Sequence, residues 1–353
     1  MFRSGWRQAL QIAATYIGTV VGAGFASGQE VWQFFTRYQT GSLIAIGFAA
    51  LLFFVLGAYV MNLGQRLNAS SLGALLLKLL PTRAAEGLQG AMLALLFALT
   101  VAMLAGGGAL LHEQFGLNPW IGSLATAALA LITLLFGMNG ILSANSLIVP
   151  AMFLLVLIVT GHSMMDSPSA TMSFSQPPEE HSSGLSLFLS ALSYAGFNLG
   201  LAMPVLIPLG CVTKQKNTLR TGAFLGAVGL FVMLAVMNGA LARNAGLMTR
   251  EIPLLELARG QGRFIVIPFA MALWAEIYST LIANLFGLTH EIRRITGMRE
   301  RTILVILLTL ALAGAQIGFG QIVRIGYPLF GVISGCILTL VIFADVKMRL
   351  RSS

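Results

Sequence analysis

Three side chains inside one apolar stretch have the types and spacing to do chemistry. Glu276 lies near the middle of a predicted membrane-spanning segment, and Ser279 and Thr280 follow it by one helical turn. A carboxylate is costly at that depth, so it is a functional residue by default, with a proton, a coupling cation or a substrate amine as its partner. Hydroxyl oxygens are ligands for hard cations such as Na⁺. The alternative is structural, because Ser and Thr also hydrogen-bond neighbouring membrane helices.

A short glycine-containing phrase occurs twice, in residues 23–28 (AGFASG) and 195–200 (AGFNLG). The copies lie nearly half of the 353-residue chain apart, and each interrupts an apolar run. Glycine inside a helix costs roughly 1 kcal/mol relative to alanine, so matched interruptions need a reason. In membrane proteins a broken helix can line a polar site near the bilayer midplane. We therefore predict helix breaks at residues 21–28 and 194–200, with chance recurrence of glycine as the alternative.

Each predicted break places opposite partial charges beside one site. The first half of a broken helix ends in unpaired carbonyls, which favour a cation, and the second half begins with unpaired N–H groups, which favour an anion. Such a site suits a small molecule that carries both an amine and a carboxylate. We predict that Asn198 contacts this ligand and that Tyr194 and Phe197 form an apolar lid, although aromatic residues here can also serve packing.

Two charged residues flank the same region. Glu30 lies two residues beyond the first predicted break, and Arg324 lies near the outer start of the last apolar segment. Opposite charges at these positions predict an external gate. The simpler interpretation is that Glu30 is a solvated residue of an external vestibule.

The composition excludes a soluble domain and predicts an all-helical membrane protein. Hydrophobic residues make up 57% of the chain, charged residues only 9%, and the mean hydropathy is +0.86. Because about 20 apolar residues span a bilayer as a helix, we predict ten spans. They cover residues 8–36, 41–62, 85–111, 119–137, 141–162, 184–210, 218–242, 264–289, 302–318 and 322–345.

The net charge of +9 reflects membrane topology rather than nucleic-acid binding. With the N-terminus inside, 15 of the 21 Lys and Arg residues face the cytoplasm, as the positive-inside rule expects. Both termini are then cytoplasmic, and the first apolar run is an anchor rather than a cleaved signal. Two cysteines and four scattered histidines indicate neither a disulfide framework nor a metal centre.

The order of elements predicts an inverted repeat. A polar stretch with three prolines, residues 163–184, divides five spans from five, so a second copy of the first half crosses the membrane upside down. We predict a first repeat at residues 1–163, an external loop at 164–183 and an inverted repeat at 184–353. Short amphipathic segments at residues 69–80 and 251–259 occupy matching places in the two halves.

These features resemble a known architecture. Ten spans in a 5 + 5 inverted repeat, with helices 1 and 6 broken, resemble the LeuT fold of the amino acid–polyamine–organocation superfamily. Residues 16–30 (YIGTVVGAGFASGQE) resemble the opening segment of the YkvI-like bacterial membrane proteins.

The resemblance implies a substrate site between spans 1, 3, 6 and 8 and a Na⁺ between carbonyls of span 1 and a Ser/Thr pair of span 8. The implied substrate-binding residues are Gly22, Ala23, Gly24, Phe25, Ser27, Met103, Tyr194, Gly196, Phe197, Asn198 and Glu276. The implied Na⁺ ligands are Ser279 and Thr280 with carbonyls of Val20, Val21 and either Ala23 or Gly24. Glu276, one turn before the pair, departs from the Na⁺-coupled pattern and keeps proton coupling open.

We therefore predict a secondary transporter of the bacterial inner membrane that moves a small amino acid or related amine by alternating access. Na⁺ is the expected coupling ion, with H⁺ through Glu276 as the alternative, and no other cofactor or obligate protein partner is implied. A membrane receptor that uses the same pocket is the other class of function. An enzyme is not predicted, because no pair of catalytic groups stands out.

Overall fold

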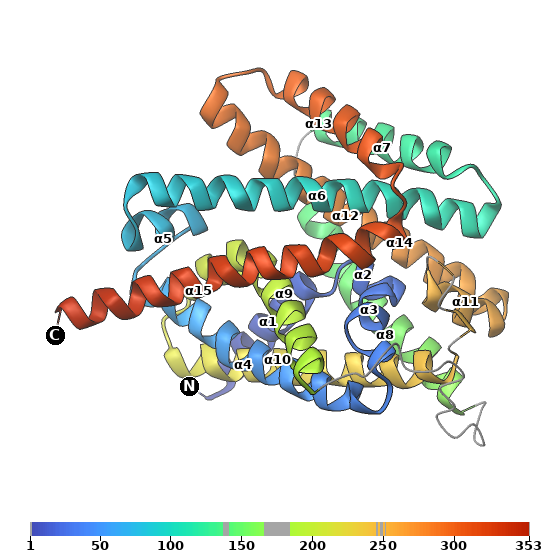
Figure 1. Ribbon diagram of the computed structural model, residues 1–353, viewed down its shortest axis with the longest axis horizontal. Coiled ribbons are helices and arrows are strands. Elements are labelled where there is room, and N and C mark those ends of the chain that lie inside the picture. Colours follow the sequence, from blue (N-terminus) through green and yellow to red (C-terminus); the bar gives the residue numbers. More distant parts are fainter. Residues whose placement is uncertain are drawn as a thin grey trace.

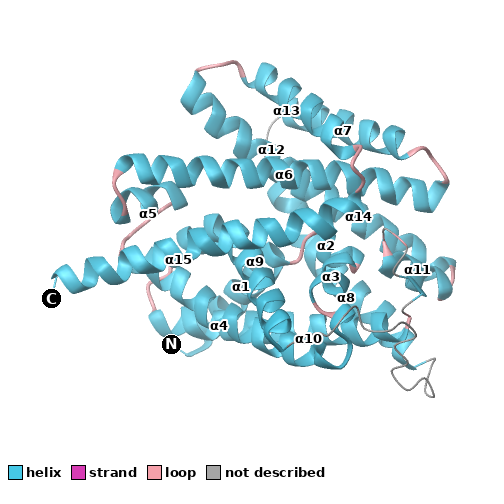
Figure 2. Cartoon of the chain, viewed as in Figure 1, coloured by secondary structure: helices cyan, strands magenta, loops and turns pink. Residues whose placement is uncertain are grey.

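The computed structural model describes residues 2–136, 141–165, 184–244, 246–247, 250 and 252–352. These residues form helices joined by short connections, without a strand in the described ranges, as Figure 2 shows. The predicted external loop lies almost wholly outside the described residues. At its edges, α8 continues to Met165 and α9 begins at Gly184.

The first half of the chain contains nine helical elements with short connections in its described residues. They are α1 (Phe2–Val20), α2 (Ala23–Ser27), α3 (Gln29–Phe34), the 3₁₀-helix η1 (Thr36–Gly41), α4 (Ser42–Arg66), α5 (Leu72–Leu79), α6 (Thr82–Phe115), α7 (Pro119–Phe136) and α8 (Ile141–Met165).

The second half follows a similar order in the residues that are described. Its elements are α9 (Gly184–Val212), α10 (Lys216–Arg243), α11 (Pro253–Gly260), α12 (Arg263–Thr296), α13 (Glu300–Ala315), α14 (Phe319–Gln321), the π-helical turn η4 (Ile322–Gly326) and α15 (Tyr327–Ser352).

Six helical stretches in the described ranges are long and apolar enough to cross a membrane: Ser42–Arg66, Thr82–Phe115, Gly184–Val212, Lys216–Arg243, Arg263–Arg293 and Phe319–Leu350. Pro119–Leu134 and Pro150–Met165 are shorter apolar helices. Apart from the interruptions at Val21–Gly22 and Gly28 and short turns near the span ends, the predicted spans fall on helices where the chain is described, so the all-helical membrane class is confirmed. The total of ten crossings stays a prediction.

The two predicted amphipathic segments are helices. α5 is capped at its N-terminus by Ser71, whose side chain accepts a hydrogen bond from the backbone N–H of Ala74 at 3.1 Å. This contact satisfies one of the N–H groups that a helix start leaves unpaired. α11 begins with Pro253, whose fixed φ suits a first helical position and whose missing N–H is not needed there.

The helices form two groups that meet around the first break (Figure 1). In one group α9 packs between α4 and α15, and α10 packs on α1 and α4. In the other, α6 packs against α7, α12 and α13, and α12 also packs on α8. The short helix α2 contacts α12, and α14 contacts α6. The interrupted segment of the first span therefore lies where the two groups face each other.

The predicted break in the first span is confirmed. α1 ends at Val20, Val21 and Gly22 are not helical, and α2 begins at Ala23. Gly22 has an extended conformation, with φ −121° and ψ −173°. A second irregularity follows at Gly28, whose φ of +86° lies in the left-handed region that glycine adopts without a steric penalty.

The predicted break in the sixth span is wrong. α9 is helical without interruption from Gly184 to Val212, through residues 194–200 and past Pro204 and Pro208. Its glycines serve close packing instead: Gly196 lies against the backbone of Gly331 and Gly335, and Gly200 lies against Ser334. Small residues allow membrane helices to approach closely, and the van der Waals attraction between the closely packed helices offsets the poor helix propensity of glycine.

This packing predicts that Gly200→Ala destabilises the protein. The added methyl group would overlap Ser334, whose Oγ would lie only 2.8 Å from it, so α9 and α15 must separate. We expect a loss of about 1–3 kcal/mol, typical of overpacking, measured by unfolding in mixed micelles. Gly87→Ala is the matched control, because Gly87 is exposed on α6 with no atom within 4 Å of an added Cβ. Equal stability of the two variants would contradict this assignment.

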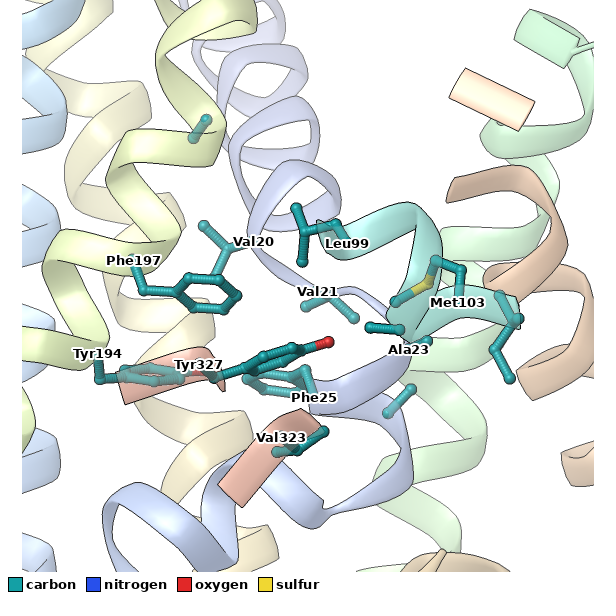
Figure 3. Packing of buried hydrophobic residues seen from close by; sticks show 14 of the residues in the cluster. Val20, Val21, Ala23, Phe25, Leu99, Met103, Tyr194, Phe197, Val323 and Tyr327 are labelled. Carbon is teal, nitrogen blue, oxygen red and sulfur yellow. The ribbon is translucent and has the colours of Figure 1, made fainter. Parts of the chain in front are cut away.

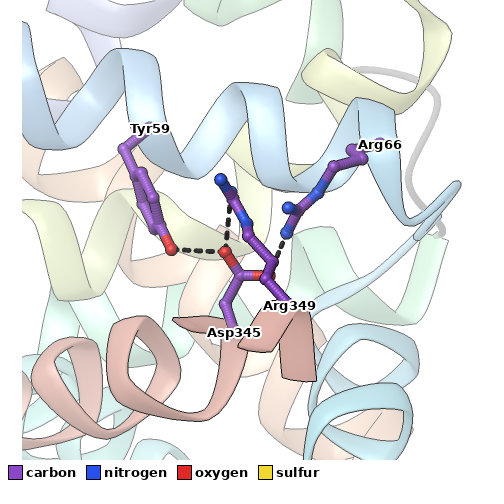
Figure 4. Close-up of polar contacts among 4 residues, drawn as sticks. All are labelled: Tyr59, Arg66, Asp345 and Arg349. Carbon is purple, nitrogen blue, oxygen red and sulfur yellow. Dashed lines mark hydrogen bonds and ion pairs between the residues drawn. The ribbon is translucent and has the colours of Figure 1, made fainter. Parts of the chain in front are cut away.

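A buried carboxylate links α4 to α15. Asp345 is fully buried, accepts a hydrogen bond from the Tyr59 hydroxyl at 2.6 Å, and pairs with Arg349 at 2.8 Å on its own helix. Arg66 of α4 forms a second ion pair with it, as Figure 4 shows. α4 and α15 each pack mainly on α9, so this cluster joins two helices across a third. Burial of Asp345 is tolerated because each carboxylate oxygen has a charged or polar partner.

The cluster predicts that Asp345→Asn lowers the free energy of unfolding by about 1–3 kcal/mol, because hydrogen bonds to a charged group are lost while both arginines stay partly exposed to water. Unfolding in mixed micelles measures the change. Glu300→Gln is the control, because its pair with Arg293 is more than half exposed. We expect less than about 1 kcal/mol for that substitution. A larger loss in the control than in Asp345→Asn would contradict the interpretation.

Candidate functional site

A cavity of about 130 Å³ lies beside the Val21–Gly22 interruption. Its walls come from α1, α2, α3, α6, α9, α12 and α15, which belong to both helix groups. Figure 3 shows Val20, Val21 and Ala23 facing Leu99 and Met103 of α6, with Phe197 and Tyr327 on the other side. The break thus opens into a space between the helix groups.

The end of α1 gives this space a row of carbonyl groups. The N–H of Val21 bonds to the carbonyl of Ile17 at 2.8 Å, and the next regular bond joins Ala26 to Gly22. The carbonyls of residues 18–21 therefore have no following helical turn to bond to. These residues line the cavity. Unpaired carbonyls at a helix C-terminus carry partial negative charge, so this wall favours a cation.

An aromatic wall closes the opposite side. The rings of Phe197 and Tyr327 lie 4.6 Å apart between centroids, and the hydroxyl of Tyr327 points toward Val21 and Ala23 (Figure 3). Tyr194 lies elsewhere, packed against Phe34, Phe35 and Phe53 at centroid distances of 4.9–5.8 Å. Of the two residues predicted to form a lid, only Phe197 faces the cavity.

One face of α12 carries three polar residues at a spacing of four. Glu276, Thr280 and Asn284 lie one above another along the helix. Thr280 and Asn284 line the cavity, whereas Glu276 is buried one turn before them and is not part of the lining. Among the described residues, neither Glu276 Oε2 nor Asn284 Nδ2 has a hydrogen-bond partner. The Ser279 hydroxyl bonds to the carbonyl of Glu276 at 3.1 Å.

Glu30 does not have the position that a gate requires. Its side chain is 4% exposed and lines the cavity, close to Gly24, whereas the side chain of Arg324 is exposed on η4. Among the described residues these two side chains form no ion pair, and the backbone carbonyl of Arg324 accepts a hydrogen bond of 3.1 Å from Gln33 of α3. Glu30 follows the left-handed turn at Gly28 and is buried, so the predicted pair does not form between these two described residues.

The cavity brings together most, but not all, of the predicted residues. Those that line it are Val20, Val21, Gly22, Ala23, Gly24, Met103, Phe197, Asn198 and Thr280. Those outside the lining are Phe25, Ser27, Tyr194, Gly196, Glu276 and Ser279. The amide of Asn198 donates to the carbonyl of Tyr194 at 3.1 Å, within its own helix.

Sequence reasoning missed three polar lining residues, which are Thr19, Asn284 and Tyr327. The hydroxyl of Thr19 donates to the carbonyl of Tyr16 at 2.8 Å, within its own helix. Asn284 was detectable, because it continues the spacing of four from Glu276 and Thr280 in an otherwise apolar helix. Tyr327 had no such signal, because its approach to Gly24 depends on how α15 packs.

Solved structures with the same arrangement of helices are membrane transporters. They include Mhp1 in an inward-facing conformation, with a TM-score of 0.67 and 15% identity over 97% of this chain and 77% of that one. MhsT in complex with L-phenylalanine has a TM-score of 0.62 and 17% identity over 94% and 88%. A Na⁺-coupled sialic acid symporter has a TM-score of 0.60 and 11% identity over 94% and 77%. The chain is a membrane protein with the LeuT fold.

Curated sequences identify the family. No protein-family model matches the chain. The uncharacterized membrane protein YkvI of Bacillus subtilis (strain 168) is 31% identical over 326 residues, which are 92% of this chain and 93% of YkvI. YyaD of the same organism is 25% identical over 335 residues, 93% and 94% of the two chains. The chain belongs to the YkvI family.

Proposed function

We propose that this protein is a secondary transporter that moves a small amino acid or related amine by alternating access through the cavity at the first break. The observation that carries the proposal is the interruption at Val21–Gly22, which exposes backbone carbonyls to a cavity between two helix groups. Two groups of helices around one central site suit rocking of one group against the other. The similar solved structures include transporters of different cargoes, so they support transport without supplying the substrate.

The proposed topology is a 5 + 5 inverted repeat, residues 1–163 and 184–353, joined by an external loop at 164–183, with both termini in the cytoplasm of a bacterium. The matching places of α5 and α11 support the repeat. The halves are unequal at the site, however. The first half contributes a broken helix to the cavity, and the second half contributes a continuous one. The unpaired backbone groups at the cavity therefore come from α1 and α2, while α9 contributes side chains.

Counterflow in liposomes tests the function directly. Protein reconstituted with an excess of unlabelled cargo inside should accumulate labelled cargo transiently, because a carrier exchanges one for the other. The cargo is first found by thermal-shift screening of amines and amino acids, since a ligand of the folded state raises its stability by mass action. Binding without exchange would contradict transport and favour a receptor that uses the same pocket.

Na⁺ is the proposed coupling ion. Thr280 lines the cavity together with Val20 and Val21, which places a hydroxyl and backbone carbonyls, the ligands of a hard cation, around one space. Ser279 is buried one position earlier, and its hydroxyl donates to the carbonyl of Glu276 in its own helix, which leaves the oxygen lone pairs available to bind a cation. The carbonyl of Gly24 already accepts a hydrogen bond from the Ser27 hydroxyl at 2.9 Å. Gly24 is therefore a weaker ligand for Na⁺ than Val20 or Val21.

We predict that the double substitution of Ser279 and Thr280 by alanine abolishes Na⁺ stimulation of uptake. The physical reason is the loss of two oxygen ligands while the α1 carbonyls remain. Uptake in proteoliposomes with and without a Na⁺ gradient measures the effect. Thr296→Ala, which removes an exposed hydroxyl near the end of the same helix, should leave the stimulation unchanged. Full Na⁺ stimulation in the double variant would exclude this site.

Proton coupling is the second candidate, and the unpartnered Oε2 of buried Glu276 favours it. A carboxyl group that carries the coupling proton must release that proton and bind another one in each transport cycle. We predict that Glu276→Gln then removes the dependence of uptake on a pH gradient, because the amide cannot titrate. Uptake measured at several external pH values checks this. Wild-type uptake by the variant at every pH would make Glu276 structural.

A further inference from the structure

Glu30 occupies the place where a ligand carboxylate would otherwise bind. Its carboxylate accepts a hydrogen bond from the backbone N–H of Phe25, in the first turn of α2. The side chain also lies against Gly24, at the point where the ring of Tyr327 approaches the same glycine. An N–H group exposed by the break is therefore satisfied by this chain's own carboxylate.

The position of Glu30 disfavours an anionic cargo group. In transporters with broken helices, the start of the second half-helix points at an anionic group of the substrate. Here that position already holds the carboxyl group of Glu30, which occupies the N–H of Phe25 and, when ionised, repels a second carboxylate. The site therefore does not suit a cargo that carries both an amine and a carboxylate, which is the cargo that the sequence predicts.

The remaining lining also favours a cation. Glu30 is the one residue with an acidic or basic side chain among the described residues that line the cavity, and its Oε2 has no hydrogen-bond partner there. Residues 18–21 at the end of α1, whose carbonyls lack a helical partner, line the same cavity. The rings of Phe197 and Tyr327 add faces that attract an ammonium group. Within the same described lining, no lysine, arginine or histidine is available to pair with a cargo carboxylate.

We propose that the cargo is a small organic amine without a carboxylate, whose ammonium group pairs with Glu30. The volume of about 130 Å³ sets its size. A protein cavity of about 150 Å³ holds benzene, so about five or six non-hydrogen atoms fit here. The proposal rests on the function above, in that the cavity is taken as the transport site.

A matched pair of ligands tests the inference on the full-length protein in detergent. Isobutylamine and valine share the same side chain and differ by the carboxylate. Isobutylamine should raise the Tm at concentrations at which valine does not. Glu30→Gln should weaken isobutylamine binding roughly 10-fold or more, as expected for loss of one charge-assisted hydrogen bond. Glu300→Gln, an exposed carboxylate far along the chain, should bind as the wild type does.

Several results would overturn the inference. The inference is wrong if valine raises the Tm of the wild type as much as isobutylamine does. It is also wrong if isobutylamine binds Glu30→Gln as tightly as the wild type, or if neither compound raises the Tm of the wild type. If Glu30→Gln does not fold, Glu30→Asp replaces it, with weakened but retained binding expected because the charge remains.

Counterflow separates this inference from the proposed function. Glu30-dependent amine binding without exchange supports the inference and contradicts transport, whereas exchange of valine supports transport and overturns the inference.

Discussion

The structure depends on one constraint, which is that backbone polar groups inside a membrane need partners. An unsatisfied group in hydrocarbon costs several kcal/mol, so an interrupted helix persists only where protein, water or ligand covers it. The interruption at Val21–Gly22 is covered by α6, α9, α12 and α15. Glu30 satisfies one exposed N–H, while residues 18–21, whose carbonyls lack a helical partner, line the cavity. The arrangement of the two helix groups follows from enclosing this segment.

The continuous α9 shows how the second half supports the first. A second break would expose another set of backbone groups, whereas the continuous helix lacks only the N–H groups that Pro204 and Pro208 cannot supply. α9 instead brings Phe197 and Asn198 to the cavity and packs closely on α15 through Gly196 and Gly200. Tyr327 of α15 reaches Gly24 from this group. α9 and α15 of the second half therefore form a closely packed wall beside the broken first span.

Much of the fold could be predicted from the sequence because its signals are local. Long apolar runs, a polar divider and the glycines near Val21 are enough for the membrane class, the helices and the first break. The error at residues 194–200 has a physical cause. The same glycine phrase allows either a break or a close helix contact, and the choice depends on Gly331, Ser334 and Gly335, which lie far along the chain.

The site was less predictable because side-chain direction is set by packing. Glu30 is buried two residues after Gly28, which adopts a left-handed conformation, and no spacing rule identifies that. Arg66 and Arg349 carry a clear topological signal in the sequence, yet both also neutralise the buried Asp345. Glu276 stood out as a lone carboxylate, but its distance from the lining depends on how α12 rotates toward α2.

Accessibility of the cavity from the two sides of the membrane tests the central claim most directly. Leu201 lines the cavity from α9, and Leu201→Cys can be labelled in a background with Cys211→Ser and Cys336→Ser. An impermeant maleimide is applied to either face of sealed vesicles, with and without Na⁺ and cargo. Alternating access predicts labelling from each face, with the two rates shifting in opposite directions when Na⁺ or cargo is added. Labelling from one face only under every condition, or from neither, would contradict the account.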